Sequence, residues 1–168
     1  NKRMKSVKGA IMSLLGEAYQ KRDKVGLIAF RKQQAELVLG ITRSVDLAQK
    51  ALATLPTGGR TPLAAGLDLA CDVIHAARIK DKDLMPVIVL VSDGKATYAS
   101  NSTSPLKSAL AGAKRVKSEK IKAIVIDADE SFLKLHLSEK IATAMDADLF
   151  TIEDLQAKDL ISAVKIST

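Results

Sequence analysis

The sequence predicts an α/β fold: a doubly wound, mostly parallel sheet with one antiparallel edge strand and helices on both faces. The main observation is alternation, because short apolar segments of strand length are separated by longer segments whose apolar residues repeat at helical spacing. The second observation is Val87–Val91, which contains no polar residue and is therefore typical of a central strand covered on both faces. A chain of 168 residues fits one domain, which we assign to residues 1–168.

The first predicted elements are a helix, a hairpin and a second helix. Apolar residues at helical spacing predict the first helix over Arg3–Arg22. Val25–Phe30 is a short apolar strand, and Ala35–Leu39 alternates enough to pair with it as the antiparallel edge strand. Ser44 is a good N-cap for the next helix, because its hydroxyl can accept a hydrogen bond from a free backbone amide of the first turn.

After the glycine pair Gly58–Gly59, helices and strands alternate to the end of the chain. Ser104 followed by Pro105 predicts a helix start, since proline is well tolerated at the first helical position. The predicted order is a helix over Pro62–Ile79, the strand Pro86–Gly94, a helix over Pro105–Lys120, the strand Ile121–Asp127, a helix over Ser131–Met145, the strand Leu149–Ile152 and a closing helix over Ala157–Ile166.

The chain opens on a helix with no strand before it, whereas every comparable helix follows a strand or a loop at the sheet edge. A missing first strand is the simplest explanation of this difference. We therefore expect the first central strand of the sheet to be absent from this chain, which would be a fragment of a longer polypeptide.

The composition argues against several classes of protein. Apolar residues make up 47% and charged residues 27%, as in an ordinary globular protein. No apolar segment approaches the roughly 20 residues that span a bilayer, and no signal-peptide pattern opens the chain. The single cysteine, Cys71, excludes an internal disulfide. We expect a cytoplasmic protein with no membrane span.

The net charge of +7 raises the question of an acidic partner. Lysine and arginine are spread along the chain, and the densest group lies at the end of a predicted helix, where cations favour the helix dipole and form a solvated face. Nucleic-acid binding would add interleaved aromatic residues or a known module, and neither is visible, so we predict no nucleic-acid partner. The dense group consists of Lys114, Arg115, Lys117, Lys120 and Lys122.

Two oxygen-bearing side chains are predicted to lie at one edge of the sheet. Thr61 precedes a helix, and Asp93 follows the end of a buried strand. Ligands of open parallel sheets are held at this edge, and Mg²⁺ prefers hydroxyl and carboxylate oxygens while keeping several waters. Each residue also has a purely structural interpretation. Thr61 can be an N-cap before Pro62 as the first helical residue, and Ser-Asp-Gly is a common turn sequence.

Other residues able to bind metals or protons have plainer interpretations. Cys71 and His75 lie four residues apart on a predicted helix, where core and rim positions are favoured over a ligand pair. His136 has no carboxylate or cysteine at ligand spacing. Asp127 ends a strand and either approaches the same edge as Asp93 or caps the following helix, with residues 129–131 as rival caps. No catalytic motif is present, so we predict no catalytic residue.

Several segments resemble the von Willebrand factor A (integrin I-like) domain, a Rossmann-like fold, and within that family the D subunit of magnesium chelatases. The Gly-Gly-x-Thr-Pro-Leu loop is the more specific to chelatases, whereas Ser-Asp-Gly is common to the whole superfamily. The matching segments are Lys8–Ala10, Arg22–Arg31, Ala35–Leu39, Leu55–Gly66 and Val89–Gly94.

The resemblance implies a metal-ion-dependent adhesion site, in which Asp-x-Ser-x-Ser, a threonine and an aspartate hold Mg²⁺. Thr61 matches the threonine and Asp93 the aspartate. The Asp-x-Ser-x-Ser part has no counterpart here, because in the family it ends the strand that precedes the first helix. The two residues therefore form a partial site, and Mg²⁺ is expected in the parent protein.

The resemblance also implies a function: a Mg²⁺-dependent protein-interaction domain of a magnesium-chelatase-like, ATP-driven complex. Such a complex inserts Mg²⁺ into protoporphyrin IX in chlorophyll-type biosynthesis. The implied partners are an AAA+-type ATPase subunit and a porphyrin-binding subunit, with a partner carboxylate at the metal. The domain itself would be non-catalytic within a ligase complex.

Three alternatives remain open. The domain could have the same fold but belong to a cobalt-chelatase-like or other ATPase system, which would act on a different substrate. A small-molecule enzyme of doubly wound fold would use Asp93 as an acid or base, but no cofactor fingerprint supports it. A basic nucleic-acid binder comes last and would show a steep salt dependence.

Overall fold

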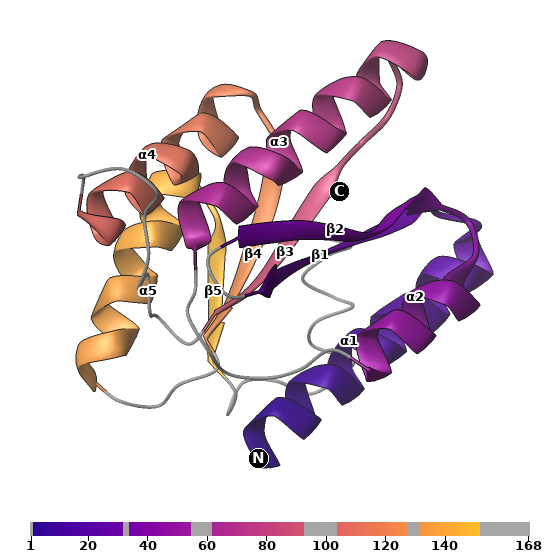
Figure 1. Ribbon diagram of the computed structural model, residues 1–168, viewed down its shortest axis with the longest axis horizontal. Helices are drawn as coiled ribbons and strands as arrows, with labels where there is room; N and C mark the ends of the chain where they lie inside the picture. Colours follow the sequence, from indigo (N-terminus) through magenta and orange to yellow (C-terminus); the bar gives the residue numbers. More distant parts are fainter. Residues whose placement is uncertain (1, 32–33, 55–61, 93–103, 128–131, 152–168) are drawn as a thin grey trace.

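A computed structural model describes residues 2–31, 34–54, 62–92, 104–127 and 132–151 (Figure 1). These residues form five helices and five strands. In chain order they are α1 (Lys2–Lys21), β1 (Val25–Arg31), β2 (Gln34–Thr42), α2 (Val45–Ala53), α3 (Leu63–Lys80), β3 (Val87–Ser92), α4 (Pro105–Ser118), β4 (Lys122–Asp127), α5 (Phe132–Met145) and β5 (Asp148–Thr151).

The strands form an antiparallel pair and a parallel sheet. β1 pairs with β2 as a hairpin, with Val25 opposite Thr42 and Arg31 opposite Gln34. β3, β4 and β5 form a parallel sheet in that order. The α/β prediction is therefore confirmed, including the antiparallel strand. Among the described strands the hairpin and the parallel sheet are separate, because no ladder joins β1 to β3.

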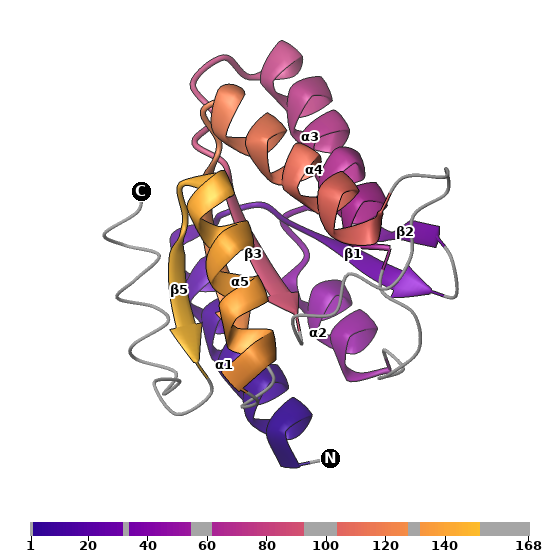
Figure 2. The ribbon, with the colours of Figure 1, turned by 90° about the vertical axis from the view of Figure 1, so that its left-hand side faces the viewer.

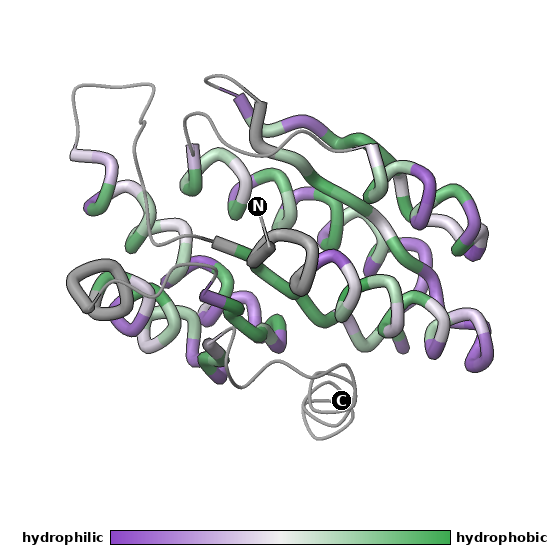
Figure 3. The backbone as a smooth tube through the Cα atoms, turned by 90° about the horizontal axis from the view of Figure 1, so that it is seen from below, coloured by the Kyte–Doolittle hydropathy of each residue, from purple (hydrophilic) through white to green (hydrophobic). Residues whose placement is uncertain are grey.

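Helices cover both faces of the parallel sheet (Figure 2). On one face, Ala10, Ile11 and Leu14 of α1 pack against alternate residues of the strands, among them Ile124 and Ile126. On the other face, α3, α4 and α5 enclose the larger core, to which the intervening residues of β4 belong. Figure 3 shows hydrophobic residues concentrated along the strands, while the helices also carry hydrophilic residues. Two-sided burial explains why residues 123–126 of β4 are all apolar.

The buried residues of α3 and α4 follow helical spacing and fix how the two helices pack. Leu63, Leu67, Cys71 and Ile74 line the inner face of α3. Gly112 of α4 lies so close that a Cβ there would be 3.3 Å from Leu67 Cβ. A glycine at this position therefore allows the two backbones to approach closely.

Three helices end in the same way, with a charged residue in the left-handed conformation. Arg22, Lys120 and Asp146 have φ values of 57°, 56° and 57° at the turns that lead from α1, α4 and α5 into the next strand. In each turn the following amide closes the helix in the pattern of a Schellman motif. These hydrogen bonds join Asp23 N to Ala18 O (2.9 Å), Ile121 N to Val116 O (3.2 Å) and Ala147 N to Ala142 O (2.9 Å).

Most predicted boundaries agree with the structure to within one or two residues. The largest difference is β2, which extends to Gln34–Thr42 instead of Ala35–Leu39, because the hairpin ladder continues with Val25 opposite Thr42. Both predicted N-caps, Ser44 and Ser104, stand directly before their helices, but only Ser104 accepts a hydrogen bond through its side chain, from Lys107 N at 3.3 Å. The closing helix predicted over Ala157–Ile166 lies outside the described residues.

Candidate functional site

The carboxyl ends of the three parallel strands form one edge of the sheet. Their last residues are in register, with Ser92 opposite Asp127 and Asp127 opposite Thr151. The three strand ends converge on the same side of the molecule (Figures 1 and 2). This is the edge where open α/β sheets hold ligands.

Helices α3 and α4 begin at this edge and run back along the strands (Figure 2). Pro62 occupies the N-cap position of α3, and Ser104 occupies that of α4. The free amides of a helix N-terminus carry a partial positive charge, which favours anionic groups nearby. The edge therefore combines strand-end oxygens with helix N-termini.

The two predicted metal ligands, Thr61 and Asp93, lie outside the described residues. Their chain neighbours are described, because Thr61 directly precedes Pro62 and Asp93 directly follows Ser92. The structure corrects the capping interpretation: α3 begins at Leu63 with Pro62 at the N-cap, so the N-cap position does not belong to Thr61. The reason is that the helical backbone starts one residue later than the Thr-Pro pattern suggested.

Asp127 is the buried polar residue of this edge. Only 1% of its surface is exposed, although it is the last residue of β4. The sequence left open whether it approaches the edge or caps the next helix, and the residues that would decide the capping, 128–131, lie outside the described ranges. The structure shows that Asp127 is buried and that it is the register partner of Ser92.

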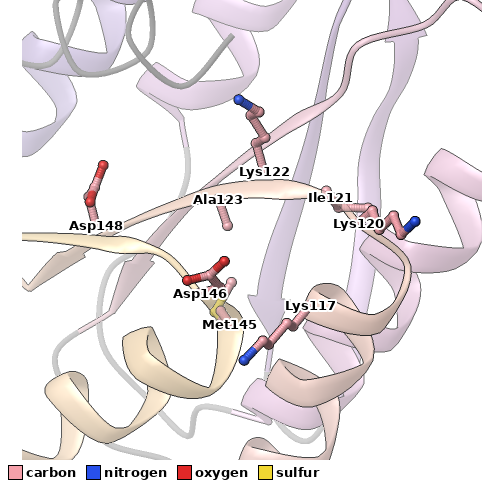
Figure 4. A pocket seen from close by; sticks show the side chains of 8 residues that line it. All are labelled: Lys117, Lys120, Ile121, Lys122, Ala123, Met145, Asp146 and Asp148. Carbon is pink, nitrogen blue, oxygen red and sulfur yellow. The ribbon is translucent and has the colours of Figure 1, made fainter.

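The opposite edge of the sheet contains an open pocket of about 480 Å³ (Figure 4). Its lining comes from the end of α4, the start of β4 and the turn between α5 and β5. Lys117, Lys120 and Lys122 are exposed, as the predicted solvated face requires. Asp146 and Asp148 lie among them, so the charge of the pocket is mixed.

Arg115 departs from the predicted solvated face, because it joins α4 to α3. Its Nη2 lies 2.8 Å from Asp72 Oδ1 and its Nη1 lies 3.4 Å from Asp68 Oδ1, both on α3, while its Nε contacts Glu119. Hydrogen bonds to Asp72 and Glu119 raise the pKa of the guanidinium further. The sequence shows that Asp68 and Asp72 lie four residues apart, as do Arg115 and Glu119. It does not show that α3 and α4 pack against each other.

Cys71 lies in the core and His75 lies at its rim, which is the arrangement that the sequence pattern favoured. Cys71 is fully buried in the core, whereas His75 is exposed. Burial, followed by the nearby Glu119 carboxylate, raises the pKa of the thiol to about 11, so the thiol is protonated at neutral pH. His136 lies in α5, where its side chain is not described.

The described residues lack two kinds of feature. They contain no group of three or more histidine, cysteine, aspartate or glutamate side chains placed to hold a metal ion. Within the same residues, no helix combines the length and the apolar character needed to cross a membrane.

A sequence model of the von Willebrand factor type A domain matches residues 1–95. The solved vWF domain of the type V pili tip protein Mfa5 from Porphyromonas gingivalis superposes with a TM-score of 0.74 at 10% identity, covering 97% of this chain and 88% of that one. At this identity the likeness shows the fold alone.

Relatives of known sequence cover almost the whole chain. It is 37% identical to an uncharacterized protein of Methanocaldococcus jannaschii, over 98% of this chain and 94% of the relative. It is 38% identical to an uncharacterized protein of Mycobacterium tuberculosis and 34% identical to the magnesium-chelatase 67 kDa subunit of Chlorobaculum tepidum, over 97% and 96% of this chain. The chain spans only 25% and 28% of the length of these two relatives.

Proposed function

Because the chain belongs to the von Willebrand factor type A domain family, we propose that it is a Mg²⁺-dependent protein-interaction domain of a magnesium-chelatase-like, ATP-driven complex. The observation that carries the proposal is the family match over residues 1–95, a range that includes Thr61 and Asp93, together with the relative named as a magnesium-chelatase subunit. The strand and helix that flank these residues, β3 and α3, support it, since they end and begin at one sheet edge.

The oxygen chemistry of the edge fits Mg²⁺. The residues assigned to the metal are the hydroxyl of Thr61 and the carboxylate of Asp93, completed by an Asp-x-Ser-x-Ser strand end. Mg²⁺ favours such hard oxygen ligands and keeps open positions for water. The described strand ends add the carboxylate of Asp127 and the hydroxyl of Thr151, while no cysteine or histidine among the described residues lies at a strand end.

The open metal position would receive a carboxylate from the partner. A carboxylate–Mg²⁺ contact has a defined direction and depends on the ion, so it can join two proteins reversibly. The proposed partners are an AAA+-type ATPase subunit and a porphyrin-binding subunit. The domain would couple them without doing chemistry itself, and we expect no ATP hydrolysis by residues 1–168 alone.

The test is a calorimetric titration of Mg²⁺ into the full-length protein and its Asp93→Ala variant. We expect saturable binding that the substitution abolishes, because a carboxylate ligand is lost. Thr61→Ala should weaken Mg²⁺ binding by the full-length protein. For residues 1–168 alone, adding a strand that ends in Asp-x-Ser-x-Ser should strengthen Mg²⁺ binding.

Ser104→Ala is the control for Thr61→Ala, because it removes a hydroxyl at the start of the neighbouring helix α4, where the proposal places no metal ligand. It should lower stability by about 1 kcal/mol and leave Mg²⁺ affinity unchanged. Mg²⁺ binding that survives Asp93→Ala intact would exclude the proposed site.

A second candidate is an interaction domain of a cobalt-chelatase-like or other ATPase system. The relatives from Methanocaldococcus jannaschii and Mycobacterium tuberculosis support this second candidate, because neither is named as a chelatase. Binding of a purified magnesium-chelatase ATPase subunit in the presence of Mg²⁺ would support the first candidate. Intact Mg²⁺ binding without that interaction would support the second.

A further inference from the structure

Two neighbouring turns form one surface at the edge where the parallel strands begin. Arg78 of α3 donates hydrogen bonds to the carbonyl oxygens of Glu119 (2.8 Å) and Lys120 (3.2 Å), at the end of α4. The strands that follow the two turns pair directly, with Val87 of β3 opposite Lys122 of β4. The turn between α3 and β3 is therefore held beside the turn between α4 and β4.

Two large apolar side chains of this surface face water. Ile79 is 70% exposed and Met85 is 66% exposed, at the two ends of the turn between α3 and β3. Hydrogen bonds within the turn order its backbone, joining Asp83 N to Asp81 Oδ1 (3.1 Å) and Leu84 N to Asp81 O (3.2 Å). The two side chains are thus presented on an ordered backbone, and their apolar area remains available for burial against a partner.

Three lysines lie on the neighbouring turn. Lys117, Lys120 and Lys122 are exposed, and the ion pairs within the described residues do not include them. Glu119 is the acidic residue among them, but its carboxylate contacts Arg115 instead. Three positive charges are therefore left to solvent beside the exposed apolar pair.

We propose that this surface, which consists of Ile79, Met85, Lys117, Lys120 and Lys122, docks an acidic amphipathic helix of a partner protein. Such a helix presents apolar and acidic side chains on adjacent stripes, which matches an apolar pair beside three lysines. Apolar contacts at the centre and charged groups at the rim are the usual arrangement of protein interfaces. The surface lies at the sheet edge opposite the proposed Mg²⁺ site, so the inference does not depend on that site.

The carboxylates near this surface favour a protein partner over a nucleic acid. Asp81 and Asp83 lie in the first turn, and Asp146 and Asp148 border the pocket beside the lysines (Figure 4). A continuous phosphate backbone would pass close to these negative charges, whereas a helix can place its few carboxylates opposite the lysines. The exposed apolar side chains are also aliphatic, whereas the bases of single-stranded nucleic acids stack on aromatic ones.

The test measures the binding of a fluorescently labelled peptide to the full-length protein by anisotropy. The peptide is a synthetic helix with leucine on one face and glutamate beside it. We expect saturable binding that weakens as salt rises, because salt screens exposed charges. Met85→Ser should raise the Kd about tenfold, because apolar burial is lost. The triple variant Lys117→Gln, Lys120→Gln and Lys122→Gln should raise it about fivefold and reduce its salt dependence.

Two variants elsewhere on the protein are matched controls. Leu47→Ser removes a 51% exposed apolar side chain of α2, and a second triple variant replaces the exposed Lys24, Lys50 and Lys107 by glutamine. Both should leave the Kd unchanged. Equal losses of affinity in test and control variants would overturn the inference, because binding would then follow net charge or general hydrophobicity.

Two further probes separate the classes of partner. A peptide with lysine in place of every glutamate should not bind, because it would meet the three lysines with like charge. Absence of binding by the acidic peptide would overturn the inference. A single-stranded oligonucleotide that binds more tightly than the acidic peptide, and loses affinity in the first triple variant, would also overturn it in favour of a nucleic-acid surface. Each of these outcomes leaves the proposed Mg²⁺ site untouched.

Discussion

At the scale of single residues, the three left-handed helix ends are the least expected feature. Non-glycine residues are disfavoured in this conformation, because the Cβ atom crowds the backbone. Yet Arg22, Lys120 and Asp146 all adopt it, at turns where glycine is the usual residue. The hydrogen bonds that close these turns offset part of the cost.

Replacing Lys120 by glycine should therefore stabilise the protein. We expect Lys120→Gly to raise the free energy of unfolding by about 0.5–1 kcal/mol, because glycine adopts positive φ without steric cost. Urea denaturation measures the change. Lys114→Gly, six residues earlier at an exposed position in the interior of α4, is the control and should lower stability by about 1 kcal/mol. A loss of stability in Lys120→Gly would contradict the assignment of strain to this turn.

At the scale of secondary-structure elements, α3 and α4 are joined by both packing and charge. Gly112 lets the two backbones approach at Leu67, and Arg115 contacts two acidic residues of α3 across the same interface. Arg78 of α3 reaches back to the end of α4, donating to the carbonyl oxygens of Glu119 at 2.8 Å and Lys120 at 3.2 Å. These contacts join α3 and α4 at several points along their length.

Removing the charge of Arg115 should weaken this pair in a salt-dependent way. Arg115→Gln leaves the acidic groups around it facing one another, and we expect a loss of roughly 1 kcal/mol at low ionic strength, less at 0.5 M salt. Urea denaturation at both salt concentrations provides the measurement. Lys114→Gln removes a neighbouring exposed charge and should have little effect. Equal losses in the two variants would show that the ion pairs of Arg115 contribute nothing.

At the scale of the whole molecule, the parallel sheet is enclosed on both faces, while the β1–β2 hairpin is a separate and more exposed unit. Residues 123–127 of β4 are all buried between β3 and β5. By contrast, β2 has no fully buried residue. Local stability should therefore differ between the two sheets.

Hydrogen exchange should report this difference. We expect β4 amides to exchange only through global unfolding, and β2 amides to exchange through a smaller opening of lower free energy. Native-state exchange at increasing urea, followed by NMR, separates the two. Equal protection of β2 and β4 would mean that hairpin and sheet unfold as one unit.

The sequence by itself determined the fold class, the order of the elements and the family, because these depend on local patterns. The apolar segment Val87–Val91, the cap at Ser104 and the Gly-Gly-Arg-Thr-Pro-Leu loop can each be recognised without a partner. Of the candidate site, the sequence supplied Thr61 and Asp93, which stay predictions. Tertiary structure alone decided the burial of Asp127, its register with Ser92 and the contacts of Arg115 with α3, since each requires segments about 35 to 47 residues apart to meet. Local patterns predict which element forms, whereas the environment of a charged side chain depends on which elements pack around it.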